Sequence, residues 1–383
     1  MKSEITKILF LVNNLNFFHS HRMPIAEAAK NQSIEVIIGY GELGGADLNI
    51  FKQKGLRLKF IPIQRGGINI FKDLLTFFYI WKFFREEKPE IIHLISIKPY
   101  LYGGIIARIL NIPSLVSAVS GLGALFIENN FKNYFLKFLL YPIYFFAFNH
   151  SNQAIIFQNL DDVKTLQRWG VLKPKKVKLI KGSGVNLENF KNFKYRSKIP
   201  VVCFAARLLI DKGINEFISA AKMIKDKGVK VRFIVAGSLD LKNPRSLTKK
   251  DLHKIKSENV VEYLGFQDDI AKLYEMSHIV CLPSYREGLP KSLIEAAAAA
   301  RAIVTTNVPG CRDAIIPNKT GLLVPVKDIN ALADAILILI NDINKCENMG
   351  IQGRYLAEKE FSINNVVKEH LDIYFELNNR TKS

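Results

Sequence analysis

Short apolar runs alternate with longer segments of helical hydrophobic periodicity, and this alternation constrains the fold more than any other feature of the sequence. In the first half we expect strands near residues 7–12, 34–38, 57–61, 91–95, 114–119, 154–157 and 177–180, with helices near 22–31, 70–87, 100–110, 131–148 and 160–169. Runs that are apolar throughout are typical of parallel strands buried on both faces, with the intervening helices as crossovers. The sequence therefore predicts a parallel α/β sheet.

The same alternation restarts after a polar, basic stretch around residues 189–199. We expect strands near 200–205, 231–236, 260–264, 279–282, 302–305 and 322–324, and helices near 213–227, 268–276, 291–300 and 330–341. A chain of 383 residues exceeds what one hydrophobic core usually supports. We therefore predict two doubly wound Rossmann-like domains, residues 1–188 and 199–360, which face each other across a cleft.

Residues 286–296 combine two carboxylates, Glu287 and Glu295, with a Gly and a Pro that can open a helix. Pro suits the first helical position, so we expect a helix from near Pro290 through residue 300, with Glu287 in the loop before it and Glu295 inside it. Backbone amides at such a helix start can bind an anion, and the carboxylates can bind sugar hydroxyls. The alternative is an ordinary capped surface helix. The amides expected at this site belong to Gly288, Leu289, Lys291 and Ser292.

Two cations, Arg207 and Lys212, directly follow the apolar run at 200–206. This run reads as a buried strand, and ligands of open α/β sheets bind outside the carboxyl ends of the strands. A forked guanidinium and a compact ammonium five positions apart suit a diphosphate. Either cation alone would be interpreted as a solvated surface charge.

Together these motifs resemble the Arg-x4-Lys and Glu-x7-Glu motifs of retaining family 4 glycosyltransferases of the GT-B fold. Residues 181–190 look like the segment that joins the two domains in that family, and residues 259–266 look like its nucleobase-facing strand and loop. The resemblance therefore covers nearly the whole chain. Residues 18–25, 120–127 and 131–148 are similar to bacterial enzymes that add N-acetylgalactosamine to undecaprenyl-diphosphate-linked sugars.

The resemblance implies a UDP-sugar donor and retention of configuration. Arg207 and Lys212 would neutralise the leaving diphosphate, Glu287 would orient the donor sugar, and Glu295 would bind ribose. The last helix, within residues 361–383, would cross back to the N-terminal domain. Asp-x-Asp occurs nowhere in the chain, and His and Cys are dispersed, so we expect no metal ion and no cofactor besides the donor substrate. The further donor-binding residues implied are Gly121, Gly123, Gly265, Phe266, Gly288, Leu289, Pro290, Lys291 and Ser292.

The N-terminal domain is expected to bind the acceptor, a polyprenyl-diphosphate-linked sugar. We place Phe17, Phe18, His19, His21 and Arg22 in the loop after the first strand, where Arg22 would reach the acceptor diphosphate or else simply face solvent. The acceptor-binding residues expected are His19, His21, Arg22 and Ser120.

Five positions bear on the chemistry of this domain. Many family members carry His where this chain has Ser120, so the acceptor-side catalytic group stays open. His93 lies inside an expected strand and reads as a core histidine. Gly121 and Gly123 would let the backbone approach a ligand, but Phe126 at the third site of Gly-x-Gly-x-x-Gly counts against a dinucleotide-dependent dehydrogenase.

The net charge of +19 is concentrated in the first half, where residues 1–200 carry 28 Lys and Arg against 13 Asp and Glu. Basic surface attracts nucleic acid and anionic lipid alike. Residues 68–84 and 131–148 combine many aromatic and aliphatic side chains with scattered Lys, as in helices that lie on an anionic bilayer. The alternative is that both are interior helices.

The compartment follows from what the sequence lacks. We expect neither a membrane-spanning segment nor a signal peptide, and the four separated cysteines read as reduced core thiols. The sequence thus predicts a cytoplasmic protein, peripheral on the inner face of the cytoplasmic membrane.

Two other classes of function stay open. A sugar-nucleotide 2-epimerase on the same fold would convert the donor without an acceptor and would need no lipid-facing aromatic residues. A nucleic-acid-binding protein ranks third and is not expected, because the sequence shows no known module and no aromatic-basic sheet face.

Overall fold

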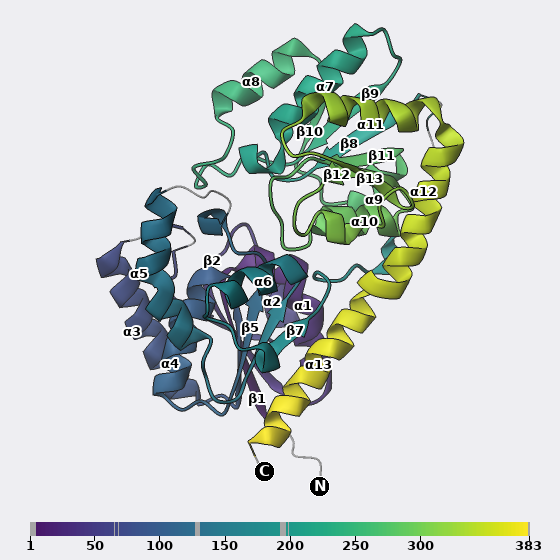
Figure 1. The fold of residues 1–383 in the computed structure, drawn as a ribbon. Helices are drawn as coiled ribbons and strands as arrows, with labels where there is room; N and C mark the ends of the chain where they lie inside the picture. The colour runs from purple at the N-terminus through teal and green to yellow at the C-terminus, as the bar shows by residue number, and fades with distance from the viewer. Residues whose placement is uncertain are drawn as a thin grey trace. The chain divides into compact units, whose positions relative to one another are not determined.

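The structure is a computed structural model that describes residues 5–64, 66–67, 69–126, 131–191, 197 and 199–381. The expected linker around 189–199 falls largely outside the described residues, as do Ile68 and Ile127. The chain divides into two compact units. Unit 1 comprises Met1–Ser183 and Asn364–Ser383, and unit 2 comprises Gly184–Ile363. In Figure 1 the colour of the ribbon follows the residue number, so the segments of each unit can be traced along the chain.

Among the described residues of unit 1, seven parallel strands form one sheet in the order β3-β2-β1-β4-β5-β6-β7. The strands are β1 Lys7–Asn14, β2 Glu35–Glu42, β3 Arg57–Phe60, β4 Ile91–Ile95, β5 Ser114–Val119, β6 Gln153–Phe157 and β7 Val177–Leu179. The α-helices are α1 Leu15–Asn31, α2 Leu48–Gln53, α3 Ile70–Glu87, α4 Gly104–Ile109, α5 Phe131–Ala147, α6 Leu160–Arg168 and α13 Ile363–Arg380. Shorter turns are the π-helix η1 Pro99–Gly103 and the 3-10 helices η2 Ala124–Phe126 and η3 Pro174–Lys176.

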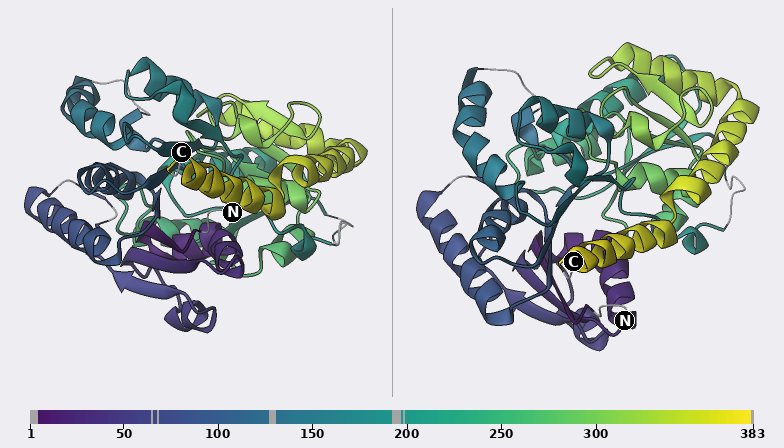
Figure 2. Two further views of the ribbon diagram at one scale, coloured as in Figure 1. Left: turned by 90° about the horizontal axis from the view of Figure 1, so that it is seen from below. Right: turned by 60° about the horizontal axis from the view of Figure 1, so that its bottom comes forward.

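Both faces of this sheet are covered by helices, because successive residues of a strand point to opposite faces. On β1, Leu9 and Leu11 face the core that includes residues of α3, η1, α4 and α5. Phe10 of the same strand faces the core that includes residues of α1 and α13. Figures 1 and 2 show α3, α4 and α5 on one flank of the sheet.

The C-terminal helix α13 completes the core of unit 1. Its residues Val366, Ile373, Tyr374 and Leu377 are at most 5% exposed and pack with residues of β1 and α1. The Tyr374 hydroxyl lies 2.6 Å from Nδ1 of His93 on β4. The expectation that the last helix returns to the first domain is confirmed.

Among the described residues of unit 2, six parallel strands form a sheet in the order β10-β9-β8-β11-β12-β13. The strands are β8 Val201–Ala205, β9 Arg232–Ala236, β10 Glu262–Gly265, β11 Ile279–Leu282, β12 Ala302–Thr306 and β13 Gly321–Val324. The α-helices are α7 Ile214–Asp226, α8 Lys249–Glu258, α9 Ile270–Glu275, α10 Lys291–Ala298, α11 Ile329–Asn341 and α12 Ile343–Leu356. The remaining turns are η4 Leu187–Asn189, η5 Ile210–Lys212, η6 Arg312–Ala314 and the π-helix η7 Ala357–Phe361.

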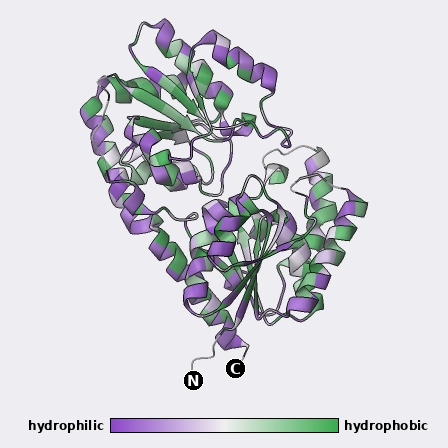
Figure 3. Cartoon of the chain, turned by 180° about the vertical axis from the view of Figure 1, so that it is seen from behind, coloured by the Kyte–Doolittle hydropathy of each residue, from purple (hydrophilic) through white to green (hydrophobic). Residues whose placement is uncertain are grey.

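The expected doubly wound α/β class is confirmed in each unit, since both sheets have the strand order of a Rossmann fold. Buried side chains fill both faces of the strands, and Figure 3 shows the strands as mainly hydrophobic. Cys203, Cys281, Cys311 and Cys346 are all free and buried, as the sequence predicts for core thiols.

Several element boundaries were predicted wrongly. Helix α1 begins at Leu15 and not near residue 22, and it contains Pro24 in its interior. The side chain of Asn14 caps it by accepting a hydrogen bond from the Phe17 amide at 2.9 Å. The residues from Phe17 to Arg22 therefore belong to a helix, and the expectation of a loop there is wrong. The sequence prediction also missed helices α2, α8 and α12.

Candidate active site

The strand order of unit 2 reverses direction between the neighbours β8 and β11. The chain segment after one of these strands turns to one face of the sheet, and the segment after the other strand turns to the opposite face. Open α/β sheets bind ligands in the crevice between two such segments. Residues 206–213 follow β8, and residues 283–290 follow β11. These two segments contain Arg207, Lys212 and Glu287, so both charged motifs of the sequence meet at the switch point of one sheet.

The segment that follows β8 is fixed by its neighbours. Its backbone bonds to the loop after β9, with the Leu208 amide 3.0 Å from the Ser238 carbonyl oxygen. Within the segment, the Asp211 carboxylate accepts two hydrogen bonds from Arg245, at 2.7 and 3.0 Å. Gly213 ends it with φ +76°, and a Cβ there would lie 2.1 Å from the Pro283 carbonyl oxygen, so only glycine fits. The positions of Arg207 and Lys212 therefore rest on a well-defined backbone.

Arg207 projects from this segment and is 44% exposed. Its Nη1 donates to Oδ2 of Asp240 at 2.6 Å, and the Asp240 side chain is only 12% exposed. The guanidinium is thus held from one side by a carboxylate of the loop that follows β9. Sequence analysis did not single out Asp240, although its place just after a strand was a signal that could have found it.

Lys212 forms an ion pair with Glu287, which joins the Arg-x4-Lys and Glu-x7-Glu motifs directly. The two side chains are 20% and 11% exposed. The hydroxyl of the fully buried Ser284 lies 2.7 Å from Oε1 of Glu287 and 2.9 Å from the Asp211 carbonyl oxygen, so it can donate to either one. Ser284 is a second residue that sequence analysis missed, and it fixes the Glu287 carboxylate beside the ammonium.

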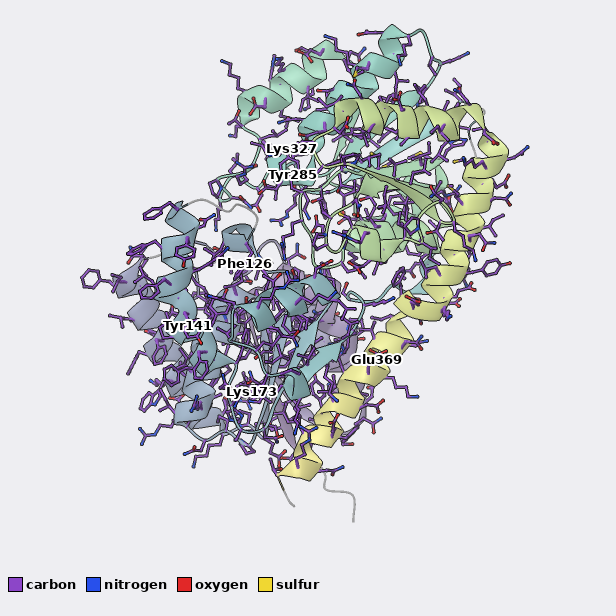
Figure 4. All side chains as sticks on the ribbon, viewed as in Figure 1. Phe126, Tyr141, Lys173, Tyr285, Lys327 and Glu369 are labelled. Atoms are coloured by element: carbon purple, nitrogen blue, oxygen red, sulfur yellow. The ribbon has the colours of Figure 1, made fainter. Side chains whose placement is uncertain are left out.

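Tyr285 connects the segment after β11 to the rest of unit 2 through two further hydrogen bonds. Its amide donates to the Asp211 carbonyl oxygen at 2.9 Å, and its hydroxyl donates to Oε1 of Glu216 on α7 at 2.7 Å. The Lys327 ammonium lies 4.9 Å from the centre of its ring, and Figure 4 labels both residues. Burial, together with the Glu216 carboxylate, raises the pKa of Tyr285, so the phenol stays a hydrogen-bond donor at neutral pH.

Helix α10 begins at Lys291, and Pro290 is its N-cap residue, with ψ 123°. The expected start of the helix near Pro290, at residue 291, is therefore confirmed, and the extended ψ of Pro290 ends the loop. The helix stops at Ala298, two residues before the expected end. Proline has no side-chain acceptor, so no side chain of the N-cap residue closes the helix start. Leu289 is 6% exposed, Gly288 is buried, and Lys291 and Ser292 are partly exposed.

The loop that carries Glu287 lies directly on the backbone at Gly310. The Glu287 amide donates to the Pro309 carbonyl oxygen at 3.1 Å. A Cβ on Gly310, where φ is +79°, would lie 2.5 Å from the carbonyl oxygens of both Glu287 and Gly288. Only glycine at position 310 allows the two backbone segments to come this close, so Gly310 fixes the position of the loop that carries Glu287.

Glu295 lies inside α10, as predicted, and its side chain is 15% exposed. Burial raises the pKa of Glu295, and the Lys291 ammonium, 3.4 Å from Oε1, acts in the opposite direction. A carboxylate with a raised pKa in a largely dehydrated position gains from a ligand hydroxyl that donates to it. The geometry therefore suits recognition of a sugar hydroxyl.

Gly265 is the last residue of β10 and Phe266 follows it, at the same carboxyl edge of the sheet as Arg207. The Gly265 carbonyl oxygen accepts a hydrogen bond from the Gly237 amide at 2.8 Å. The Phe266 ring is 65% exposed, so it offers an aromatic surface at the carboxyl edge of the sheet. An exposed ring there can stack on a planar base.

In unit 1, His19, His21 and Arg22 belong to α1, and they do not form one cluster. His19 and His21 are partly exposed. His21 stacks on Phe17, with ring centroids 4.1 Å apart, and its Nδ1 lies 2.7 Å from the Ser20 hydroxyl.

Arg22 is 2% exposed, so the expectation that it might face solvent is wrong. Its Nη2 lies 3.4 Å from the hydroxyl of Ser120 at the end of β5. Burial lowers the pKa of Arg22 to about 10, while nearby Tyr374 raises it, so the side chain stays charged at neutral pH. The buried Arg22 cation therefore lies next to Ser120, which directly precedes Gly121 and Gly123 in the chain. The φ angles of these two glycines are +124° and +72°.

His93 is a fully buried core histidine, as predicted. Its ring stacks at 5.7 Å on that of His370 from α13. Burial lowers the pKa of both, that of His370 to about 3, and Arg22 pushes both pKa values in the same direction. Both rings are therefore neutral at physiological pH, which leaves Arg22 as the charged member of this group.

The described residues lack two other features. They contain no group of three or more His, Cys, Asp or Glu side chains placed to hold a metal ion. Nor does any described helix have the length and apolar character needed to cross a membrane.

Two family models match this sequence and together span both units. The model described as glycosyl transferases group 1 matches residues 186–355, and the model described as glycosyl transferase 4-like matches residues 7–159. The first match includes the Arg207, Lys212, Glu287 and Glu295 motifs. The second covers the α1 histidines and Ser120.

The chain is also similar to individual proteins along most of its length. It is 32% identical to the N,N'-diacetylbacillosaminyl-diphospho-undecaprenol alpha-1,3-N-acetylgalactosaminyltransferase of Campylobacter jejuni, covering 88% of this chain and 90% of that protein. It is 31% identical to the capsular polysaccharide biosynthesis glycosyltransferase CapM of Staphylococcus aureus, covering 85% and 88%. The structure of Anabaena HepE in complex with UDP and glucose superposes with a TM-score of 0.77 at 19% identity, covering 96% and 98%. This structural likeness shows the GT-B fold.

Proposed function

Because this chain belongs to the group 1 and type 4-like glycosyltransferases, we propose that it transfers an N-acetylhexosamine from a UDP-sugar to a polyprenyl-diphosphate-linked sugar. The observation that carries the proposal is the 32% identity, over 88% of the chain, to a relative named for N-acetylgalactosamine transfer to an undecaprenol-linked sugar. N-acetylgalactosamine is therefore the first donor sugar to test. The product would serve the assembly of a surface polysaccharide or another glycan.

Unit 2 supplies the groups that this reaction needs on the donor side. The bond between the anomeric carbon and the diphosphate oxygen breaks while the acceptor hydroxyl oxygen bonds to the same carbon, on the same face. The hydroxyl proton passes to the departing phosphate oxygen. Arg207, Lys212 and the N-terminus of α10 stabilise the charge that develops on the diphosphate. Glu287, fixed by Ser284, orients the donor sugar.

Four further sets of donor contacts complete the proposed site. Glu295 accepts a hydrogen bond from a ribose hydroxyl, and Gly265 and Phe266 face the base. The backbone at Gly288, Leu289, Pro290, Lys291 and Ser292 lies against the phosphates and the sugar. Gly121 and Gly123 of unit 1 are the remaining proposed donor contacts.

On the acceptor side we propose His19, His21 and Ser120 as the polar contacts. Arg22 is too deeply buried for wide contact with a ligand, and it acts on the acceptor diphosphate through its charge and through Ser120. A buried charge is little screened by salt, so its effect on an anionic group at Ser120 extends over several ångströms.

Membrane attachment is proposed to run through an aromatic stripe on α3 and α5. The large apolar side chains of this stripe are 36% to 87% exposed, and Figure 3 shows hydrophobic residues distributed along both helices. Their spacing at three, four, seven and eight residues places them on one face of each helix. Exposed aromatic rings beside basic residues suit the headgroup region of an anionic bilayer. The stripe consists of Ile70, Phe71, Leu74, Leu75, Phe78 and Tyr79 on α3 and Phe131, Tyr134, Phe135, Phe138, Leu139, Tyr141, Phe145 and Phe146 on α5.

Purified protein incubated with a short-chain polyprenyl-diphosphate sugar and EDTA should form product with UDP-N-acetylgalactosamine. UDP-N-acetylglucosamine and UDP-glucose serve as competing donors, and nuclear magnetic resonance of the product reports the anomeric configuration. Product that forms only after manganese is added would contradict the metal-independent mechanism. Transfer to water-soluble sugars but never to the lipid-linked sugar would contradict the proposed acceptor.

Glu295→Gln should weaken UDP binding by about tenfold, because a hydrogen bond to a charged group is worth about 1.5–3 kcal/mol. It should also change the pH dependence of stability. Since burial raises the pKa of Glu295, the native protein binds this proton more tightly than the unfolded chain, so the contribution of Glu295 to stability falls as pH rises through its pKa. Thermal melts from about pH 4 to about pH 8 should show a shallower fall in the variant than in wild type. The exposed Glu347 on α12 provides the matched Glu347→Gln control, and unchanged UDP affinity in Glu295→Gln would remove the ribose assignment.

A further inference from the structure

We propose that Asp240 is a positioning residue that holds the guanidinium of Arg207 in the orientation in which it receives the donor diphosphate. The inference rests on the proposed role of Arg207 and adds a residue outside both sequence motifs. The ion pair between the two side chains joins the loops that follow the neighbouring strands β8 and β9.

The Asp240 loop is itself held in place. The Asp240 amide donates to the Ser246 hydroxyl at 3.0 Å, and its carbonyl oxygen accepts from the Asn243 amide at 2.7 Å. The Leu208–Ser238 hydrogen bond is joined by one from the Leu247 amide to the Leu208 carbonyl oxygen, at 2.9 Å. The carboxylate therefore sits on a fixed backbone, whereas Arg207 is the longer and more exposed partner. In such a pair the carboxylate determines where the guanidinium points.

The geometry of the pair leaves part of the guanidinium open to a ligand. Only Nη1 of Arg207 bonds to Asp240, and among the described residues Nη2 and Nε have no protein partner. A guanidinium carries five N–H donors in a rigid fork, so a diphosphate can bind the other edge while the carboxylate stays in place. Asp240 therefore does not need to be displaced when the donor binds.

The Asp240–Arg207 ion pair improves the orientation of the Arg207 guanidinium and contributes little to protein stability. An ion pair with a partner that is 44% exposed contributes little to the free energy of unfolding. An unrestrained Arg side chain, however, loses rotamer entropy when a ligand fixes it, and the ion pair with Asp240 restricts the Arg207 side chain before the donor binds. We therefore expect the effect of Asp240 in kinetics and donor affinity, with little change in melting temperature.

A double-mutant cycle tests the inference. Asp240→Asn should lower kcat/KM by about tenfold in the wild-type background, and Asp240→Ala by at least as much. In the Arg207→Ala background either substitution should change kcat/KM by less than about twofold, because the group that Asp240 positions is gone. Melting temperature and UDP affinity are measured on every variant. The matched control is Glu376→Gln on α13, which removes the carboxylate of the Lys178–Glu376 ion pair at 2.7 Å and should leave activity unchanged.

The possible outcomes separate the inference from the proposed function. Equal losses in both backgrounds would mean that Asp240 acts on the fold and not through Arg207, and the inference would be wrong. A gain in UDP affinity in Asp240→Asn would also overturn it, because Asp240 would then compete with the diphosphate. Wild-type turnover by Arg207→Ala would instead refute the proposed diphosphate site itself.

Discussion

Arg207→Ala and Lys212→Ala should each lower kcat/KM by about two to four orders of magnitude, because each removes a positive charge from the place where negative charge develops on the leaving diphosphate. Initial rates with a UDP-sugar and a lipid-linked acceptor provide the measurement. The effect should appear in kcat as well as in KM, since the charge on the diphosphate is greater in the transition state than in the bound donor.

Both variants should have small structural side effects. Loss of the Arg207 guanidinium removes an ion-pair partner of the Asp240 carboxylate, whose side chain is 12% exposed, so a small fall in melting temperature is expected. Loss of the Lys212 ammonium leaves the Glu287 carboxylate, 11% exposed, with Ser284 but without its cation, so a small loss of stability is expected. Lys272→Ala on α9, where the ammonium is 79% exposed, is the control for removal of one positive charge. Near-normal turnover by both site variants would contradict the diphosphate assignment.

Replacing Phe71, Phe78, Phe135 and Phe138 together with Ser should lower partition onto anionic liposomes by about a thousandfold. Each ring is 54% to 86% exposed, so none is needed for the core. Burying a Phe side chain gains about 1.5–3 kcal/mol when complete, and a ring in the headgroup region gains about 1 kcal/mol of this. Four rings then contribute about 4 kcal/mol, which corresponds to about three orders of magnitude in partition.

Liposome sedimentation of the wild type and the quadruple variant, at low and high salt, measures this effect. High salt should weaken the remaining attraction of the basic residues. The matched control replaces four exposed apolar residues of unit 2, Ile316, Ile338, Ile351 and Tyr355, with Ser and should keep wild-type binding. Transfer to a water-soluble acceptor analogue should be unaffected by the quadruple change. Equal liposome binding by wild type and variant would show that the stripe serves another purpose.

The strands were predictable from the sequence because a parallel strand buried on both faces is a short apolar run, and such runs are easily seen. Helix α8 was missed because its ten residues are mostly polar and Ile255 alone is buried. Helix α1 was started too late because Pro24 indicates a helix start, whereas the real start is marked by Asn14. Helix α8 is mostly exposed, so hydrophobic periodicity carries little information about it, whereas α1 packs into the core and was misjudged only at its start.

The charged motifs of unit 2 were predictable because their chemistry is local: Arg207 and Lys212 follow one strand, and Glu287 precedes one helix. The partners that orient them were not. Asp240 and Ser284 come from other segments, and only the parallel order of β9, β8 and β11 brings these segments together. For the same reason the burial of Arg22 was not foreseen, because α13, which closes over it, comes from the far end of the chain.

The discontinuity of unit 1 has a consequence for the order in which the protein folds during synthesis. The residues of unit 1 up to Ser183 leave the ribosome before unit 2, but Val366, Ile373, Tyr374 and Leu377, which complete their core, leave after it. The contact between His93 and Tyr374 spans 281 positions, so it forms only at a late stage. Unit 2 is continuous and can finish folding first. Until α13 arrives, the nascent chain exposes the apolar side chains that α13 covers, in addition to its aromatic stripe.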